Sequence, residues 1–124
     1  IVSFEDALDR IEARLARGDA VRVVTGHFDP LLRAHARRLE EIAASDGRPV
    51  VVVTEPACPL LPAEARAVLV AALDTVELVT LAPPAGLTRL VDLVPRGRLL
   101  RGEEEDLRLR ADFMRLVRDR CAAG

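Results

Sequence analysis

The chain has 124 residues, of which 50% are hydrophobic and 31% are charged, and its formal net charge is −2. This length and composition fit one domain with a packed core rather than a disordered chain, and no apolar run reaches the length of a membrane span. Aromatic residues make up only 2% of the chain, without Trp or Tyr, so a surface that stacks nucleic-acid bases is not expected.

The first half of the chain alternates helical and strand patterns. Ser3 precedes apolar residues at helical spacing, which predicts a capped helix that ends at Gly18. Residues 21–25 are β-branched and apolar on both faces, as in an interior parallel strand. Pro30 suits the first turn of a helix that runs to about Ala44, and a run of valines predicts a second strand over 49–54.

The second half continues the alternation. After a proline-punctuated loop, the patterns predict a helix over 63–73, a strand over 76–81, a helix over 87–93, a short strand over 97–101 and a long helix over 103–121. The long helix has five candidate buried positions: Leu107, Leu109, Phe113, Leu116 and Val117. We therefore expect one Rossmann-like α/β domain over residues 1–124, with a parallel sheet of four to five strands and helices on both faces.

Cysteine and histidine usage indicates a reduced protein without a structural zinc site. Cys58 and Cys121 are the only cysteines, neither lies in a C-x-x-C pair, and the chain has two histidines. This pattern does not support a structural zinc site. Without a visible signal peptide, it predicts a cytoplasmic location with no attachment to a membrane.

The turn after the first strand has the layout of an anion site. Gly26 allows close backbone approach, and the free N–H groups and dipole of the following helix favour a phosphate. Ligands of such folds bind beyond the carboxyl ends of the strands, where the strand order reverses. Because all eighteen basic residues are arginine, any phosphate contact must come from arginine, histidine or backbone amides.

The same segment resembles the nucleotide-binding signature of the cytidylyltransferase-like nucleotidyltransferases. Gly26, Phe28 and Asp29 match the G-x-F-D turn of that superfamily, Pro30 matches its adenylyltransferase branch, and His35 falls at the second histidine of its H-x-G-H element. Residues 61–66 and 71–79 also resemble the family segment in which an arginine-bearing helix leads into a strand. The resemblance covers roughly residues 20–82.

The resemblance implies transfer of a nucleotidyl group from CTP or ATP to a phosphorylated small-molecule acceptor, with release of pyrophosphate. Such a transfer requires in-line positioning, Mg²⁺ and cationic groups around the reacting phosphate. It implies a catalytic role for His35. His27 occupies the variable position of G-x-F-D inside the predicted anion site, and we expect it to share this role by partly replacing the absent first histidine. The implied nucleotide- and phosphate-binding residues are Thr25, Gly26, Phe28, Asp29 and Arg66. A homodimer is the ordinary assembly for a small α/β protein of this type.

Several of these residues also have a purely structural interpretation. Phe28 suits a core anchor, Asp29 suits a cap before the helix, and His35 suits a helical histidine with local hydrogen bonds.

Two departures from the family pattern support a different function. Leu32 stands at the first histidine position and Ala34 at the glycine position of the H-x-G-H element. The late helix begins with the acids at 103–106, which would repel a polyphosphate at that end. The alternative is therefore a catalytically degenerate relative that acts as a nucleotide-sensing or protein-interaction module.

Overall fold

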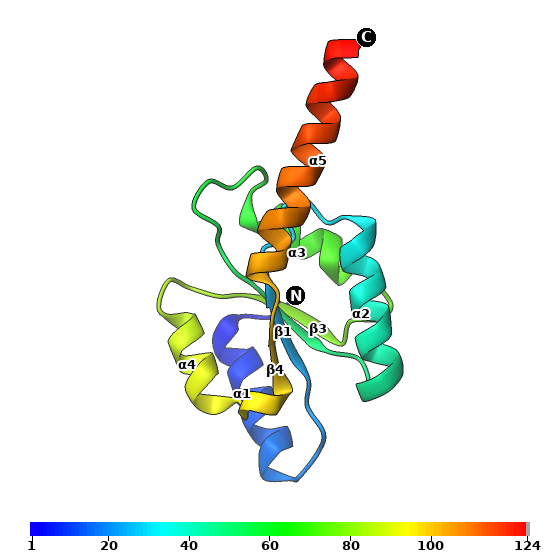
Figure 1. The fold of residues 1–124 in the computed structure, drawn as a ribbon. Helices are drawn as coiled ribbons and strands as arrows, with labels where there is room; N and C mark the ends of the chain where they lie inside the picture. Colours follow the sequence, from blue (N-terminus) through cyan, green and yellow to red (C-terminus); the bar gives the residue numbers. More distant parts are fainter. Residues whose placement is uncertain (124) are drawn as a thin grey trace.

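The computed structural model describes residues 1–123 and contains one four-stranded, all-parallel sheet with the order β3-β2-β1-β4 (Figure 1). The strands are β1 (Val23–Gly26), β2 (Val50–Val53), β3 (Leu78–Leu81) and β4 (Leu99–Arg101). The helices are α1 (Phe4–Ala16), α2 (Arg33–Asp46), α3 (Ala63–Ala71), α4 (Gly86–Leu93) and α5 (Glu103–Ala123), with a 3₁₀ turn at Arg96–Arg98. This architecture confirms the predicted Rossmann-like α/β class and its parallel sheet.

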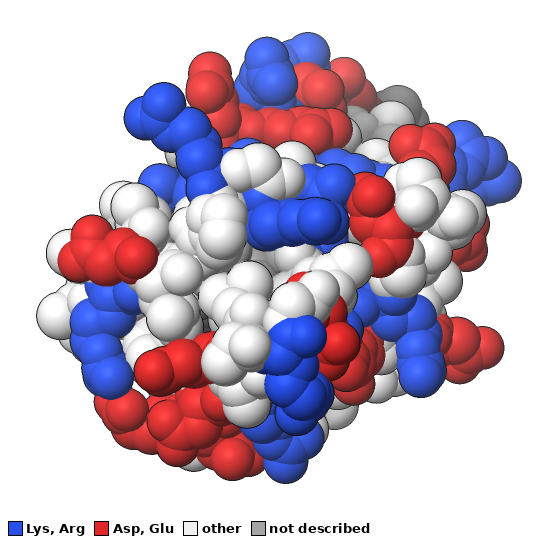
Figure 2. Space-filling model, turned by 90° about the horizontal axis from the view of Figure 1, so that it is seen from below, with Lys and Arg blue, Asp and Glu red and all other residues white. Residues whose placement is uncertain are grey.

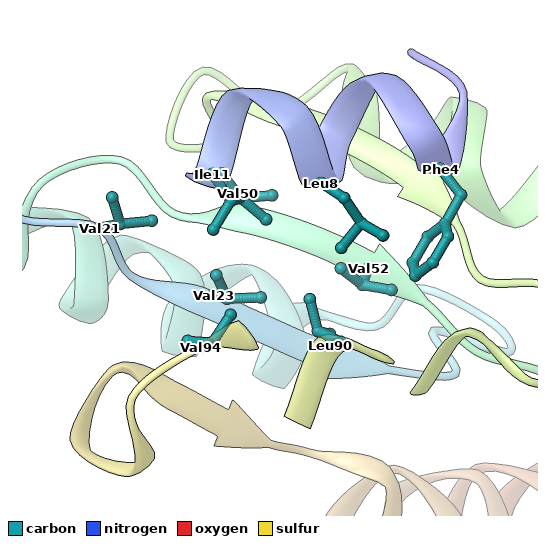
Figure 3. Close-up of a cluster of buried hydrophobic side chains, with 9 residues drawn as sticks. All are labelled: Phe4, Leu8, Ile11, Val21, Val23, Val50, Val52, Leu90 and Val94. Atoms are coloured by element: carbon teal, nitrogen blue, oxygen red, sulfur yellow. The ribbon is translucent and has the colours of Figure 1, made fainter. Parts of the chain in front are cut away.

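The two faces of the sheet bury alternate residues of the valine-rich strands. Val23, Val50 and Val52 pack under α1 and α4 together with Ile11 and Leu90 (Figure 3). On the other face, a second cluster joins the sheet to α2 and α3; its fully enclosed members are Val24, Phe28, Leu39, Val51, Val53, Ala67, Val70 and Val79. Each such valine contributes about 1.5–3 kcal/mol on burial, so the two clusters hold the strand ends in a fixed arrangement.

The first helix begins as its sequence predicts. The hydroxyl of Ser3 accepts a hydrogen bond from the Asp6 amide (3.1 Å), which caps α1.

The second helix begins three residues later than Pro30. Leu32 is the N-cap residue of α2, and Nδ1 of His35 accepts a hydrogen bond from the Leu32 amide (2.9 Å). The prediction of a helix starting at Pro30 was therefore wrong. Residues 27–31 instead form a turn, in which Phe28 adopts a φ of 48°.

The last helix leaves the body of the domain after its first turns. In Figure 1, α5 projects away from the sheet and from the other helices. Leu107, Leu116 and Val117 are 49%, 53% and 39% exposed, so the expectation that they are buried was wrong. Leu109 and Phe113 are half-buried. Amphipathic spacing predicted a buried face, but no described element of the chain covers the distal part of this helix.

Within the described residues, none of the helices combines the length and apolar character that a bilayer crossing requires.

Candidate functional site

The strand order reverses between β1 and β4. The chain runs outward from β1 through β2 to β3 and then returns to place β4 on the other side of β1. Gly26 ends β1, and Glu103 begins α5 directly after β4. The turn over residues 26–29 and the first turn of α5 therefore meet at the switch point, where ligands bind in folds of this kind. We refer to this place as the switch-point corner.

The corner is tightly packed around Gly26. A Cβ atom at this position would lie 2.5 Å from Oδ2 of Asp106 and 2.9 Å from the ring of Phe28. Phe28 is fully buried, and its ring centroid lies 5.3 Å from that of His35. The absence of a side chain at Gly26 thus allows a close approach, and the group that approaches in this structure is the Asp106 carboxylate of the protein itself, where the sequence predicted a phosphate.

Asp106 is the centre of the corner. Its Oδ2 accepts a hydrogen bond from the His27 amide at 2.8 Å and lies 3.5 Å from the Phe28 amide nitrogen. Its Oδ1 lies 2.9 Å from Nε2 of His35 and 3.3 Å from Nη2 of Arg38. The side chain is 1% exposed. Amides that the sequence assigned to a phosphate are therefore bonded to an internal anion.

The surroundings of Asp106 stabilise its charged form. Burial alone raises the pKa of the carboxyl, but the adjacent His35 ring, the guanidinium of Arg38 and the hydrogen bond from the His27 amide outweigh it. The net result is a pKa below the ordinary value for aspartate. Asp106 consequently carries its negative charge at neutral pH.

Both ring nitrogens of His35 face partners within the protein. Nδ1 accepts from the Leu32 amide and therefore carries no proton, so the proton of the neutral ring lies on Nε2, towards Asp106. The contact with Asp106 is short but not well aligned as a hydrogen bond. With a side chain 1% exposed, His35 caps α2 and supports Asp106.

His27 lies beside the same carboxylate. Burial lowers its pKa, and the carboxylates of Asp106 and Glu103 only partly oppose this effect. The residue is 9% exposed. A neutral imidazole is a weaker ligand for a polyphosphate than the imidazolium that phosphate binding would favour.

Thr25 forms a hydrogen bond with Glu103, the second acidic residue of the switch-point corner. Its hydroxyl lies 2.6 and 2.7 Å from the two carboxylate oxygens of Glu103 and donates to that carboxylate. Arg101 donates to the same group at 3.0 Å. Thr25 is fully buried, so its side chain joins β1 to the start of α5.

Asp29 and Arg66 hold the loop that follows β2. The carboxylate of Asp29 accepts from the amides of Leu60 (2.7 Å) and Leu61 (2.8 Å), and Arg110 lies 3.3 Å away. Asp29 therefore ties this loop, rather than the start of α2, to the turn.

Arg66 is fully enclosed. Its guanidinium donates to the carbonyl oxygens of Leu61, His27 and Thr54 and to the carboxylate of Glu55, over distances of 2.7–3.1 Å. All three of its nitrogens are engaged in these contacts, so the side chain fixes the backbone around the corner.

Two cavities flank the corner. One of about 510 Å³ lies at the carboxyl ends of β2 and β3 and is lined by Thr54, Glu55, Ala82, Pro83, Pro84 and Leu87. Another of about 250 Å³ lies between α2 and β4, where Arg38 contributes to the wall. None of the seven residues that the sequence assigned to the site lines either cavity.

The charges of the surface are mixed. In the view of Figure 2, arginine and acidic side chains are interspersed with uncharged ones. Several arginines of the domain pair with acids, as Arg22 does with Asp46 (2.6 Å) and Arg14 with Glu77. Over residues 1–123, His, Cys, Asp and Glu side chains form no group of three or more that could hold a metal ion.

The structure thus brings together Thr25, Gly26, His27, Phe28 and His35 at one corner, and the buried Asp29 and Arg66 hold the adjoining loop. Sequence reasoning missed Asp106 and Arg38 as members of the corner. The acidic run at 103–106 could have indicated Asp106 from the sequence. No sequence feature other than its position on α2 could have indicated Arg38. Neither a protein-family model nor a curated protein matches this chain.

Proposed function

We propose that this chain is a non-catalytic relative of the nucleotidyltransferases and acts as a protein-interaction module. Its own Asp106 carboxylate takes the place of a nucleotide phosphate. The observation that carries the proposal is the 2.8 Å hydrogen bond from the His27 amide to Asp106, made at the turn where a phosphate would bind.

A phosphate would have to displace this carboxylate or bind beside it. Displacement breaks the contacts of Asp106 with His27, His35 and Arg38 in a buried setting. Binding beside it places like charges about 4 Å apart, which costs on the order of 4 kcal/mol at an effective dielectric constant near 20. A cost of this size is enough to offset the gain from one charge-assisted phosphate contact of about 1.5–3 kcal/mol.

The remaining groups do not restore a triphosphate site. Nδ1 of His35 accepts from the Leu32 amide and Nε2 faces Asp106, so the buried ring is directed at groups of the protein itself, and Leu32 has no side-chain donor at the first histidine position. Arg66 is enclosed by backbone carbonyl oxygens and Glu55. The acids at the start of α5 also occupy the positive end of the helix dipole, where the phosphates of a ligand would otherwise be favoured.

An active transferase that uses CTP or ATP with Mg²⁺ is the second candidate. The strand order and the location of the Gly26 turn at the switch point favour it, because that corner is the usual ligand site of the fold. In that case the first turn of α5 would have to move out of the corner. His35 and His27 would then contact the phosphates, and Mg²⁺ would neutralise the reacting group.

Calorimetry separates the two candidates. CTP, ATP and CDP are titrated into the chain with and without Mg²⁺, and pyrophosphate release is assayed with phosphorylated alcohols and sugars as acceptors. We expect dissociation constants weaker than about 1 mM, equivalent to a binding free energy of less than about 4 kcal/mol, and no pyrophosphate. Submillimolar binding together with pyrophosphate release would refute the proposal.

A variant tests the role of the carboxylate directly. Asp106→Asn keeps the shape of the side chain and removes its charge, so it should bind inorganic pyrophosphate more tightly than the unmodified chain. Asp112→Asn, which alters an exposed acid farther along α5, is the matched control. Equal affinities for all three proteins would show that Asp106 does not exclude phosphate.

A further inference from the structure

The strand β4 is an edge strand with an open outer side. It pairs with β1 (Figure 1), and the described part of the chain has no strand on its other side. The amide of Gly102 donates to the carbonyl oxygen of Thr25 at 2.8 Å, so the backbone groups of Gly102 and, by alternation, of Leu100 face β1. The backbone groups of Leu99 and Arg101 therefore point outward. Each of these residues offers an N–H donor and a C=O acceptor to a further strand.

A cavity lies beside this edge on each face of the sheet. The one between α2 and β4, of about 250 Å³, has an apolar wall formed by Val24, Ile42 and Leu100. Its charged residues are already paired within the chain. Arg38 pairs with Glu105 at 3.0 Å. Arg101 pairs with Glu103 at the same distance. Leu100 is 38% exposed, so this α2-side cavity fits an apolar side chain.

The cavity between α4 and β4 is basic. Its volume is about 240 Å³, and its wall contains apolar and arginine side chains: Val91, Val94, Arg96, Leu99 and Arg101. Arg101 is held by Glu103, whereas Arg96 and Arg98 are exposed and form no ion pair with any residue that the structure describes. No acidic residue lines this cavity. The α4-side cavity therefore fits a carboxylate on a short apolar stem.

The two cavities together define the sequence of a strand that fits the edge. Successive side chains of a strand point to opposite faces of a sheet, so neighbouring residues of an added strand enter the two cavities in turn. A residue directed to the α2 side is favoured when apolar, and the residues before and after it are favoured when acidic. A second copy of β4 does not match this pattern, because it would bring Arg101 rather than a carboxylate to the α4-side cavity.

We propose that β4 binds an extended segment of another protein, in which an apolar residue lies between two acidic residues, as a further strand of the sheet. The hydrogen bonds of the main chain at Leu99 and Arg101 supply affinity for any strand, and the two cavities supply the preference for this pattern. The acidic side chains neutralise Arg96 and Arg98, and the apolar side chain covers Leu100. The proposal deepens the proposed function by naming the chemistry of the protein partner, and rests on it in that respect.

Fluorescence anisotropy with labelled peptides tests the pattern. A peptide of about eight residues with the central sequence Glu-Leu-Glu should bind with a dissociation constant below about 1 mM. A peptide with central Lys-Leu-Lys should bind at least tenfold more weakly, because it brings cations to a basic cavity. The Glu-Leu-Glu peptide N-methylated at its central residues should lose a similar factor, because it lacks the donors for β4. Equal affinities for the three peptides, or no binding of the first, would overturn the proposal.

A charge reversal locates the site. Arg96→Glu should weaken the binding of the Glu-Leu-Glu peptide at least tenfold and strengthen that of the Lys-Leu-Lys peptide. Arg118→Glu makes the same change at an exposed arginine of α5 and is the matched control, which should bind as the unmodified chain does. Both positions are exposed, so circular dichroism should show a folded domain in each variant. Equal effects of the two substitutions would indicate a general attraction of charge and contradict binding at β4.

Amide hydrogen exchange identifies the edge directly. The amides of Leu99 and Arg101 should become protected when the Glu-Leu-Glu peptide is added, whereas the amide of Gly102, which already donates to Thr25, should change little. Protection of the first two amides in the chain alone, increasing with its concentration, would show that a second copy occupies the edge and would overturn the proposal.

The outcomes distinguish strand addition from the proposed function. Failure of the peptide to bind overturns strand addition and leaves the nucleotide titrations unaffected. A chain that binds the Glu-Leu-Glu peptide at β4 and also releases pyrophosphate from CTP or ATP supports strand addition and refutes only the non-catalytic assignment.

Discussion

Replacing Asp106 with alanine should destabilise the whole domain, although the residue lies on a helix that is mostly exposed. The carboxylate is 1% exposed and joins three segments of the chain through His27, His35 and Arg38. Truncation leaves the His27 amide without its acceptor and removes the anion from beside a guanidinium. The effect follows from the contacts of this one side chain rather than from helix propensity, because alanine is the better helix former.

The magnitude can be worked out from these contacts. A hydrogen bond to a charged group contributes about 1.5–3 kcal/mol, and removing one partner of a buried ion pair costs about 3–5 kcal/mol. Because Arg38 is 20% exposed, water can solvate its guanidinium once the carboxylate is removed. The expected loss of stability therefore lies at the lower end of the range of about 3–5 kcal/mol. We expect Asp106→Ala to lower the free energy of unfolding by about 3–4 kcal/mol, out of the roughly 5–15 kcal/mol typical of a domain.

Urea unfolding followed by far-ultraviolet circular dichroism measures this loss, since the chain has no Trp or Tyr for fluorescence. The midpoint should fall while the slope stays the same. Asp112→Ala is the control, because this acid is 68% exposed and pairs with the equally accessible Arg115, so it should change stability by less than about 0.5 kcal/mol. A loss below about 1 kcal/mol for Asp106→Ala would refute the interpretation that the carboxylate anchors the corner.

Two further substitutions probe the same corner. Gly26→Ala places a Cβ 2.5 Å from Oδ2 of Asp106 and should lower the free energy of unfolding in urea by about 2–3 kcal/mol. The loss should be smaller when Asp106 is already alanine, because the clashing carboxylate is then absent. Strictly additive losses in the double variant would contradict the clash. Burial lowers the pKa of folded His27 from its ordinary 6.5, so the unfolded chain takes up a proton first and stability is lost as the pH falls below about 6.5. His27→Gln should lose less stability than the unmodified chain between pH 7.5 and the folded-state pKa, and identical pH dependence in the two proteins would exclude this contribution.

Local patterns in the sequence determined the class of the fold. The runs of valine at 50–53 and at 23–24 are apolar on both faces, and such strands are stable only between two helical layers. Ser3 marked the start of α1, and Gly26 marked the end of β1. The acids at 103–106 marked both the start of α5 and an unfavourable charge for a phosphate. The starts and ends of these helices and strands depend on residues close by in the sequence, so periodicity and capping patterns are enough to predict them.

Only the tertiary structure decided what fills the switch-point corner. Asp106 reaches an amide 79 residues away, and no local pattern distinguishes its carboxylate from those of Glu104 and Glu105 on the same turn. Likewise, the helical spacing of Leu116 and Val117 indicates an apolar face but not whether another element covers it. Helical periodicity shows which side chains share a face of a helix. Whether that face is buried depends on the direction in which the helix leaves the end of the preceding strand, β1 or β4. That direction is set by the packing of the whole sheet.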